Sequence, residues 1–151
     1  MTIDIFTSND EKEVLRLLSQ AGLPTEDLTE DLAIDKLHHF LVAKGEDGSV
    51  VGAIGIEPYL EVGLLRSLVV HPSYRRKGLG KQLADALESL ARQKGIKTLY
   101  LLTTTAIQYF PRLGYKVTQR AHAPASIAKT EEFKNICPVS AVCMFKNLSS
   151  K

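Results

Sequence analysis

Residues 62–103 place a strand, a glycine-containing loop, a helix and a second strand in close succession, and this order restricts the fold more than any other feature of the chain. The segment VGLLRSLVV is largely apolar, which is typical of a strand buried on both faces of a sheet. The segment LGKQLADALESLARQKG has leucines at helical spacing and ends at Gly95, and IKTLYLLT follows as a strand. Such short connections predict a βαβ crossover with two parallel neighbouring strands.

The flanking segments predict further strands and helices. TIDIF alternates like a strand, and a helix follows with Ser8 or Asn9 as N-cap and Gly22 past its end. FLVAK and SVVGAIGIEPYLE predict a hairpin around the turn GEDG. A short helix at AIQYFPRLG and strands at YKVTQR and SAVCMFK complete the pattern, and we expect the last strand to form an edge available for pairing with a second copy.

One domain over residues 1–151 is the organisation that this pattern favours, because no repeat or linker interrupts it. The expected fold class is α/β (α+β): a mixed, mostly antiparallel sheet with a parallel central strand pair and flanking helices. A hydrophobic content of 44% in 151 residues is enough for one sizeable core.

Composition excludes several classes of function. No apolar run approaches the roughly 18 residues of a membrane span, and the N-terminal residues lack the basic and apolar regions of a signal peptide. We therefore expect a cytoplasmic protein without a membrane partner. A net charge of +2 gives no basic face for nucleic acid. Cys137 and Cys143 have no companions at metal-ligand spacing, so we expect reduced thiols and no metal site.

The loop RRKGLG, residues 75–80, has the composition of an anion site. It opens a helix, where backbone N–H groups lack partners within the helix, and Gly78 and Gly80 let a ligand approach that backbone. Arg75, Arg76 and Lys77 add positive charge. The spacing matches neither a Walker loop nor a Rossmann loop. From these residues alone, a solvated basic turn remains an equal alternative.

The surrounding sequence resembles a known family. LVVHPSYRRKGLGKQL resembles the acetyl-CoA-binding motif of the GNAT acetyltransferases, a strand ending in L-x-V, then Pro, then [QR]-x-x-G-x-[GA] opening a helix. TTTAIQYFPRLGY resembles the family's second motif. The two motifs cover about residues 50–117. The matching positions are Leu68, Val70, Pro72, Arg75, Gly78 and Gly80 in the first motif, and Ala106, Tyr109, Arg112, Gly114 and Tyr115 in the second.

The resemblance implies acetyl-CoA as co-substrate, with no metal, and transfer of the acetyl group to the amine of a small molecule by direct attack in a ternary complex. Amides from Arg76 to Lys81 would hold the diphosphate of CoA, and Leu68 to Val70 would hold its pantetheine arm. Relatives are commonly dimers, so a homodimer is one possibility, and the sequence itself does not give the oligomeric state. The residues assigned to CoA are Leu68, Val69, Val70, Arg75, Arg76, Lys77, Gly78, Leu79, Gly80, Lys81, Thr103, Tyr109, Phe110 and Arg112.

A narrower resemblance extends over nearly the whole chain. The segments AGLP, LLRSLVV, LYLLTTTA, RLGY and KTEEFKNICPVSAVCMFKNL are similar to the small arsenic-resistance N-acetyltransferases. That family name rests mostly on the location of the genes beside arsenic-resistance genes. It suggests an amino-acid-like toxin as the acceptor but does not establish one.

The chain departs from the family at positions that serve the chemistry. Relatives often carry Glu where this chain has Arg66, Tyr where it has Phe110, and Asn where it has Thr103. Phe110 cannot protonate the leaving thiolate. Tyr109 is an alternative donor one position earlier, although the spacing to Gly114 argues against it. The remaining proton sources are water and the attacking ammonium, with proximity of amine and thioester supplying much of the rate.

Arg66 is a charge in an apolar strand and therefore needs an anionic partner. Either Glu57 or the carboxylate of an amino-acid-like acceptor would satisfy it. Glu57 and Glu61 are the nearest candidates for the general base, with His38 or His39 as a further candidate. Because the usual carboxylate and tyrosine are missing, a non-catalytic acyl-CoA-binding or regulatory module with the same fold is the alternative function.

Overall fold

The structure is a computed structural model that describes residues 2–22, 40–75, 77–104, 106–130, 133–134 and 140–148. The acidic segment 23–39, whose sequence favours a loop with a short helix and which contains His38 and His39, lies outside the described residues, as do Arg76 and Cys137.

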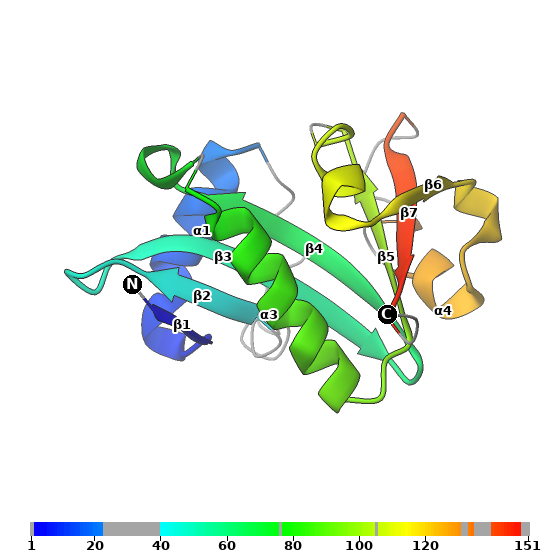
Figure 1. The fold of residues 1–151 in the computed structure, drawn as a ribbon, viewed down its shortest axis with the longest axis horizontal. Coiled ribbons are helices and arrows are strands. Elements are labelled where there is room, and N and C mark those ends of the chain that lie inside the picture. Colours follow the sequence, from blue (N-terminus) through cyan, green and yellow to red (C-terminus); the bar gives the residue numbers. More distant parts are fainter. Residues whose placement is uncertain are drawn as a thin grey trace. The chain divides into compact units, whose positions relative to one another are not determined.

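Within these described ranges, seven strands form one mixed sheet in the order β1-β2-β3-β4-β5-β7-β6, and Figure 1 labels them along the chain. The parallel pair is β4–β5, with Val62 opposite Thr98, whereas β1–β2, β2–β3, β5–β7 and β6–β7 are antiparallel. The expected βαβ crossover and fold class are therefore confirmed. The strands are β1 (Thr2–Ile5), β2 (Phe40–Lys44), β3 (Val50–Tyr59), β4 (Val62–Val70), β5 (Thr98–Thr103), β6 (Lys116–Thr118) and β7 (Val142–Asn147).

The described helices are α1 (Glu11–Gln20), α3 (Leu79–Gln93) and α4 (Ala125–Ala128), with four 3-10 helices at Ser8–Asp10, Pro72–Tyr74, Phe110–Leu113 and Arg120–His122. None of the described helices is long and apolar enough to cross a membrane.

The short helix expected at AIQYFPRLG is a turn followed by one 3-10 helix, Phe110–Leu113.

The chain divides into two compact units. The first contains Met1–Ile56 and Ser67–Leu87, and the second contains Glu57–Arg66 and Glu88–Lys151. The strands β3 and β4 and the helix α3 continue from one unit into the other.

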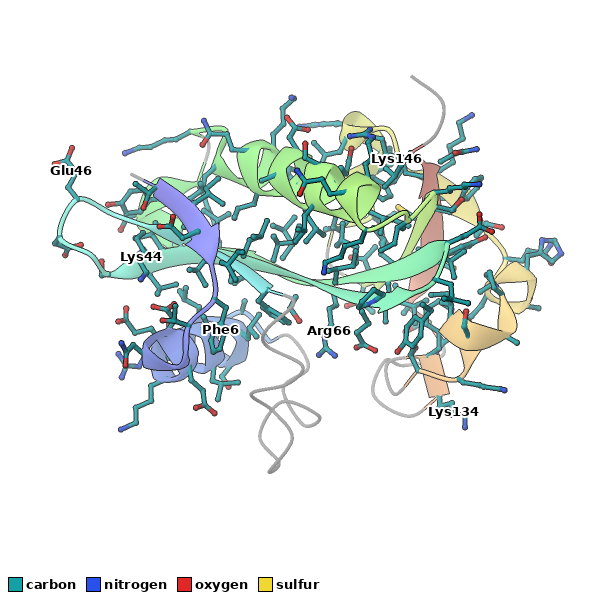
Figure 2. The ribbon with its side chains drawn as sticks, turned by 90° about the horizontal axis from the view of Figure 1, so that it is seen from below. Phe6, Lys44, Glu46, Arg66, Lys134 and Lys146 are labelled. Carbon is teal, nitrogen blue, oxygen red and sulfur yellow. The ribbon has the colours of Figure 1, made fainter. Side chains whose placement is uncertain are left out.

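In the first unit, α1 packs on one face of the strands and the start of α3 on the other (Figure 2). The apolar stripe of α1, Val14, Leu17 and Leu18, joins a buried cluster with Phe6, Phe40, Val42, Val50, Ala53 and Val69. On the opposite face of β3, a Cβ on Gly52 would lie 3.0 Å from Leu83 Cδ1 and 3.4 Å from Leu79 Cδ2. The leucine stripe of α3 therefore packs closely against β3.

The start of α1 differs from the expectation. Asp10 is the N-cap residue, not Ser8 or Asn9, and its side chain makes no cap hydrogen bond. The Asp10 carboxylate instead accepts from the Thr7 amide at 2.9 Å and pairs with Lys44 at 3.1 Å. Burial raises the pKa of Asp10, but the hydrogen bonds from Thr7 and Lys44 outweigh burial and leave the pKa below its ordinary value.

In the second unit, β7 lies between β5 and β6. The expectation that the last strand is an edge is therefore wrong. Cys143 and Met144 are both buried on successive positions of β7, so both faces of this strand are covered. The outer strand β6 has only three residues and leaves Val117 64% exposed.

Candidate functional site

The glycine loop lies in the first unit, where β4 passes into α3. The 3-10 helix Pro72–Tyr74 follows β4, and α3 begins at Leu79 directly after Gly78, which has a φ of 78°. This left-handed conformation favours glycine. The Gln82 amide donates to the Gly78 carbonyl at 3.1 Å, which closes the first turn of the helix. The amides before Gln82 thus stand at a helix N-terminus, the arrangement that favours anions.

The basic side chains of the loop remain at its surface. Arg75 Nε donates to the Val70 carbonyl at 3.2 Å, so that this guanidinium folds back onto the end of β4. Lys77 Nζ lies 5.4 Å from the centre of the Tyr74 ring, and Lys81 pairs with Asp85 at 2.8 Å. These contacts keep three cations close to the start of α3.

A cavity of about 380 Å³ lies beside this loop, and its lining includes Tyr74, Lys77 and Leu79. Glu46 and Asp47 from the β2–β3 turn also line it. Because two carboxylates repel a phosphate, this cavity does not suit a diphosphate. The helix start is therefore the better anion site.

Ser67 gives β4 an unusual backbone immediately before the segment Leu68–Val70. Its φ is 61°, which is rare for a residue other than glycine and costs roughly 1–3 kcal/mol. Ser67 and Val69 are buried, whereas Leu68 and Val70 are partly exposed. The backbone of β4 thus departs from a regular strand at the segment predicted to meet the pantetheine arm.

The second motif surrounds another cavity, within the second unit. Thr103 Oγ1 accepts from the Ala106 amide at 2.9 Å and so fixes the turn after β5. The cavity has a volume of about 430 Å³ and is lined by Thr104, Ala106, Ile107, Gln108, Tyr109 and Arg112. Phe110 is 5% exposed and lies edge-to-face with Tyr109 and Tyr115. Tyr109 and Arg112 therefore line this cavity, whereas Phe110 belongs to the core.

These observations can be set beside known proteins. Residues 7–115 match the acetyltransferase (GNAT) family. An amino-acid acetyltransferase of Pseudomonas aeruginosa (strain LESB58) is 30% identical over 124 residues, which are 81% of this chain and 28% of that protein.

The chain belongs to the GNAT acetyltransferase family.

Solved structures show the same fold. N-acetylglutamate synthase from Neisseria gonorrhoeae, complexed with coenzyme A and N-acetyl-glutamate, superimposes with a TM-score of 0.83 at 20% identity, covering 97% of this chain and 35% of that one. A Mycobacterium tuberculosis protein in complex with CoA gives a TM-score of 0.81 at 18% identity, covering 97% and 99%. This GNAT chain spans about a quarter of the length of the curated relatives it matches.

Arg66 has a carboxylate partner within the protein. Its Nη1 lies 2.7 Å from Glu57 Oε2, and the side chain of Arg66 is 1% exposed. The hydroxyl of Tyr59 donates to the other oxygen, Glu57 Oε1, at 2.6 Å. Both oxygens of Glu57 thus accept hydrogen bonds. Glu57 is an anionic partner of Arg66, as one of the two expectations from the sequence has it.

Tyr59 is a site residue that sequence reasoning missed. It follows Glu57 by two positions, and residues two apart share a face of a strand, so the spacing contained the signal. Tyr59 also packs against a buried apolar cluster of the second unit. The cluster consists of Leu64, Ile127 of α4, Phe133 and Cys143. This cluster makes the surroundings of Leu64 apolar.

Cys143, a member of the buried cluster around Leu64, has a clearly shifted pKa. Burial raises the pKa of the Cys143 thiol to about 11, so this buried cysteine is not a nucleophile at neutral pH. Among the described residues, no group of His, Cys, Asp and Glu side chains is arranged to hold a metal ion.

Proposed function

We propose that this GNAT protein is an acetyl-CoA-dependent N-acetyltransferase whose acceptor is the amine of an amino acid or an amino-acid-like small molecule. The observation that carries the proposal is the glycine loop at the start of α3 within a chain of this family. The named activity of the matching relatives, amino-acid acetylation, supports the choice of acceptor. The narrower assignment to an arsenic-resistance enzyme rests on sequence segments alone and remains part of the hypothesis.

The donor is assigned to residues of both motifs. Amides of residues 76–81 hold the diphosphate, with Arg75, Lys77 and Lys81 adding charge, and the segment Leu68–Val70 binds the pantetheine arm. Thr103, Tyr109, Phe110 and Arg112 belong to the second motif, in which Thr103 fixes the turn and Tyr109 and Arg112 line its cavity. No metal is required.

The reaction is a direct attack in a ternary complex. A base takes one proton from the acceptor's ammonium, and the resulting amine attacks the thioester carbonyl to form a C–N bond. The C–S bond breaks, and the second proton that the nitrogen loses goes to the CoA thiolate. Glu57 is the candidate base. The hydrogen bonds that it accepts from Arg66 and Tyr59 orient its carboxylate.

Arg66 is the candidate contact for the acceptor's carboxylate. A guanidinium carries five N–H donors and can serve two carboxylates at once. The Arg66–Glu57 pair presents a positive and a negative group, which matches the two charges of an amino acid. We further propose a cytoplasmic homodimer that acts on small molecules and binds neither nucleic acid nor membranes.

A panel of amino acids and their decarboxylated amines tests this function, with release of CoA thiol from acetyl-CoA as the readout. We expect turnover on amino acids and a preference for them over the matching amines. In Arg66→Met the preference disappears, because KM rises for the amino acid alone. The kcat falls for both acceptors, since Glu57 loses a hydrogen bond that orients it, and binding of acetyl-CoA is unchanged. An equal rise in KM for both acceptors contradicts the role of Arg66.

A non-catalytic acyl-CoA-binding module is the second candidate. The burial of Phe110 at the usual tyrosine position, together with the internal pairing of Glu57, favours it. In the same panel, binding of acetyl-CoA without thiol release on any acceptor supports the module and contradicts the enzyme.

A further inference from the structure

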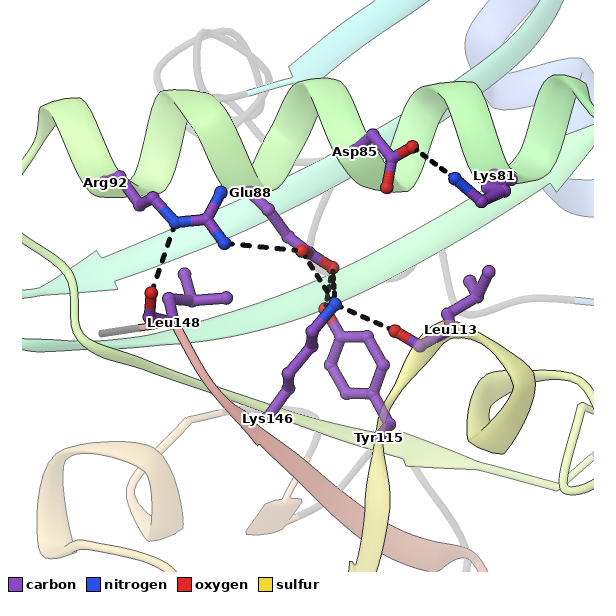
Figure 3. A network of polar contacts seen from close by, with 8 residues as sticks. All are labelled: Lys81, Asp85, Glu88, Arg92, Leu113, Tyr115, Lys146 and Leu148. Carbon is purple, nitrogen blue, oxygen red and sulfur yellow. Dashed lines mark hydrogen bonds and ion pairs between the residues drawn. The ribbon is translucent and has the colours of Figure 1, made fainter. Parts of the chain in front are cut away.

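An ion pair between a buried carboxylate and a partly exposed ammonium links α3 to β7 in the second unit (Figure 3). Glu88 of α3 is 4% exposed, and Lys146 of β7 approaches its two carboxylate oxygens at 2.9 and 3.1 Å. The Tyr115 hydroxyl also donates to Glu88, at 3.2 Å. Arg92 lies 4.0 Å from the same carboxylate and is half-exposed, so its contribution is small.

Lys146 makes a third contact, to the turn that closes the second motif. Its Nζ donates to the Leu113 carbonyl at 2.8 Å, and Leu113 ends the 3-10 helix that begins at Phe110. An ammonium has three N–H donors, and three acceptor oxygens surround this one. The carbonyl at the end of the helix is therefore held by a charged donor, the stronger kind of hydrogen bond.

The residues after Leu113 enclose the same ammonium. Gly114 has a φ of 96°, and a Cβ there would lie 3.1 Å from Lys146 Cε, so the turn packs directly on the lysine side chain. The ammonium also lies 5.5 Å from the centre of the Tyr115 ring. Lys146 thus contacts each of three successive residues of the turn.

This turn is continuous with the wall of the second-motif cavity. Tyr109 and Arg112 line that cavity, and the Arg112 amide donates to the Tyr109 carbonyl at 3.1 Å. Replacing a buried ion pair by apolar residues is often neutral for stability, so stability alone does not require a charged pair here. Holding the Leu113 carbonyl in one position, by contrast, requires a hydrogen-bond donor such as the Lys146 ammonium.

We propose that Glu88 and Lys146 are positioning residues for acetyl-CoA: Glu88 orients the ammonium, and the ammonium fixes the Tyr109–Leu113 segment through the Leu113 carbonyl. The part that concerns acetyl-CoA rests on the proposed function. The fixing of the segment is a property of the protein without ligand.

The test compares Lys146→Arg, Lys146→Met and the double variant Glu88→Leu/Lys146→Met with the wild type. Lys97→Met is the matched control, because Lys97 pairs with Glu61 at 2.8 Å in the same unit but both side chains are exposed. Three quantities are measured: the urea midpoint, amide hydrogen exchange of residues 106–115 without ligand, and the Kd and KM for acetyl-CoA.

We expect the urea midpoint of the double variant to fall, because the buried Tyr115 hydroxyl loses its Glu88 acceptor. Beyond the uniform acceleration that this loss of stability causes, exchange within residues 106–115 accelerates at least tenfold, and Kd and KM rise about tenfold. One charge-assisted hydrogen bond is of the size that a tenfold change requires. Lys146→Arg retains a charged donor and should therefore keep most of the wild-type exchange rates and acetyl-CoA affinity. Lys97→Met should leave the exchange of residues 106–115, the Kd and the KM unchanged.

Wild-type exchange in the double variant, or acceleration spread evenly over the whole protein, overturns the positioning role. If the wild type itself does not bind acetyl-CoA, the proposed function fails, and the exchange experiment still decides whether the pair fixes the segment.

Discussion

Tyr109 and Phe110 are neighbours in the sequence but have different surroundings. Tyr109 lines the second-motif cavity, and Phe110 is buried between two aromatic rings. If the Tyr109 hydroxyl protonates the leaving thiolate, Tyr109→Phe lowers kcat by about 100-fold and leaves the Kd of acetyl-CoA unchanged. Steady-state kinetics and calorimetric binding check this. An unchanged kcat instead assigns the proton to water or to the ammonium.

Phe110→Tyr is the matched variant, and it places a hydroxyl in the core. A buried hydroxyl without a partner costs roughly 1–3 kcal/mol. We therefore expect Phe110→Tyr to reduce the free energy of unfolding by that amount and not to raise kcat. A gain in kcat contradicts the geometry and supports the position that the family motif assigns to the tyrosine.

Cys143 gives a prediction about pH. Burial raises its pKa from 9.0 to about 11, so the unfolded chain loses this proton at lower pH than the folded chain. The stability contributed by the protonated thiol is complete below about pH 9 and is lost as the pH rises through about 11. In a Cys137→Ser variant, we expect no reaction with a thiol reagent at pH 8 until urea unfolds the protein. Prompt reaction of the native variant contradicts the burial.

Residue roles were predictable where one residue conflicts with its neighbours. A charge within the apolar strand LLRSL predicts a partner anion, and Glu57 was one of two named possibilities. The pairing of Glu88 with Lys146 was not predictable, because 58 positions separate the two residues and each is unremarkable in its own segment. The positive φ of Ser67 also leaves no signal in the sequence, since tertiary contacts determine it.

At the scale of elements, Gly52 sets how closely β3 approaches the start of α3. A Cβ there would lie 3.0 Å from Leu83 Cδ1 and 3.2 Å from the Val69 carbonyl oxygen. We expect Gly52→Ala to displace the first turns of α3, to cost about 1–3 kcal/mol of stability and to weaken CoA binding roughly tenfold. Urea unfolding and calorimetric titration measure the two effects.

Ala53→Gly is the control for that variant. Ala53 is fully buried in the cluster that includes residues of α1, on the opposite face of β3. Glycine within a strand lowers stability by roughly 0.5–1 kcal/mol, and we expect the Kd of CoA to remain that of the wild type. If both variants weaken CoA binding equally, the spacing between β3 and α3 is not what sets the affinity.

Elements were predictable from periodicity, whereas their lateral order was not. The leucine stripe and the apolar run predicted the βαβ crossover, because local spacing determines both elements. The position of β7 between β5 and β6 depends on which strands meet after chain reversal, and local spacing does not encode this. The burial of Cys143 and Met144 on both faces of β7 is the feature that distinguishes it from the short, exposed β6.

For the whole molecule, charge is unevenly distributed along the chain. Residues 89–130 contain no Asp or Glu but seven Lys or Arg, and thirteen of the seventeen acidic residues precede residue 62. Although the net charge of the whole chain is only +2, the segment 89–130 is therefore strongly basic. CoA carries several phosphate charges, so long-range attraction favours its binding, and added salt screens that attraction over about 8–10 Å.

Thermal unfolding with fragments of CoA tests which part of the ligand the protein recognises. At a ligand concentration of 100 times Kd, binding stabilises the folded state by about 2.7 kcal/mol, which corresponds to a rise in Tm of roughly 5–10 °C for a chain of this length. We expect CoA and dephospho-CoA, which both contain the diphosphate, to raise Tm by similar amounts. Pantetheine lacks the diphosphate and should raise Tm little at the same concentration. The shift for CoA should also shrink between 50 and 500 mM NaCl, since the loop contributes exposed cations. If pantetheine stabilises as well as CoA, or the shift is independent of salt, the helix N-terminus at Gly78 is not the anion site.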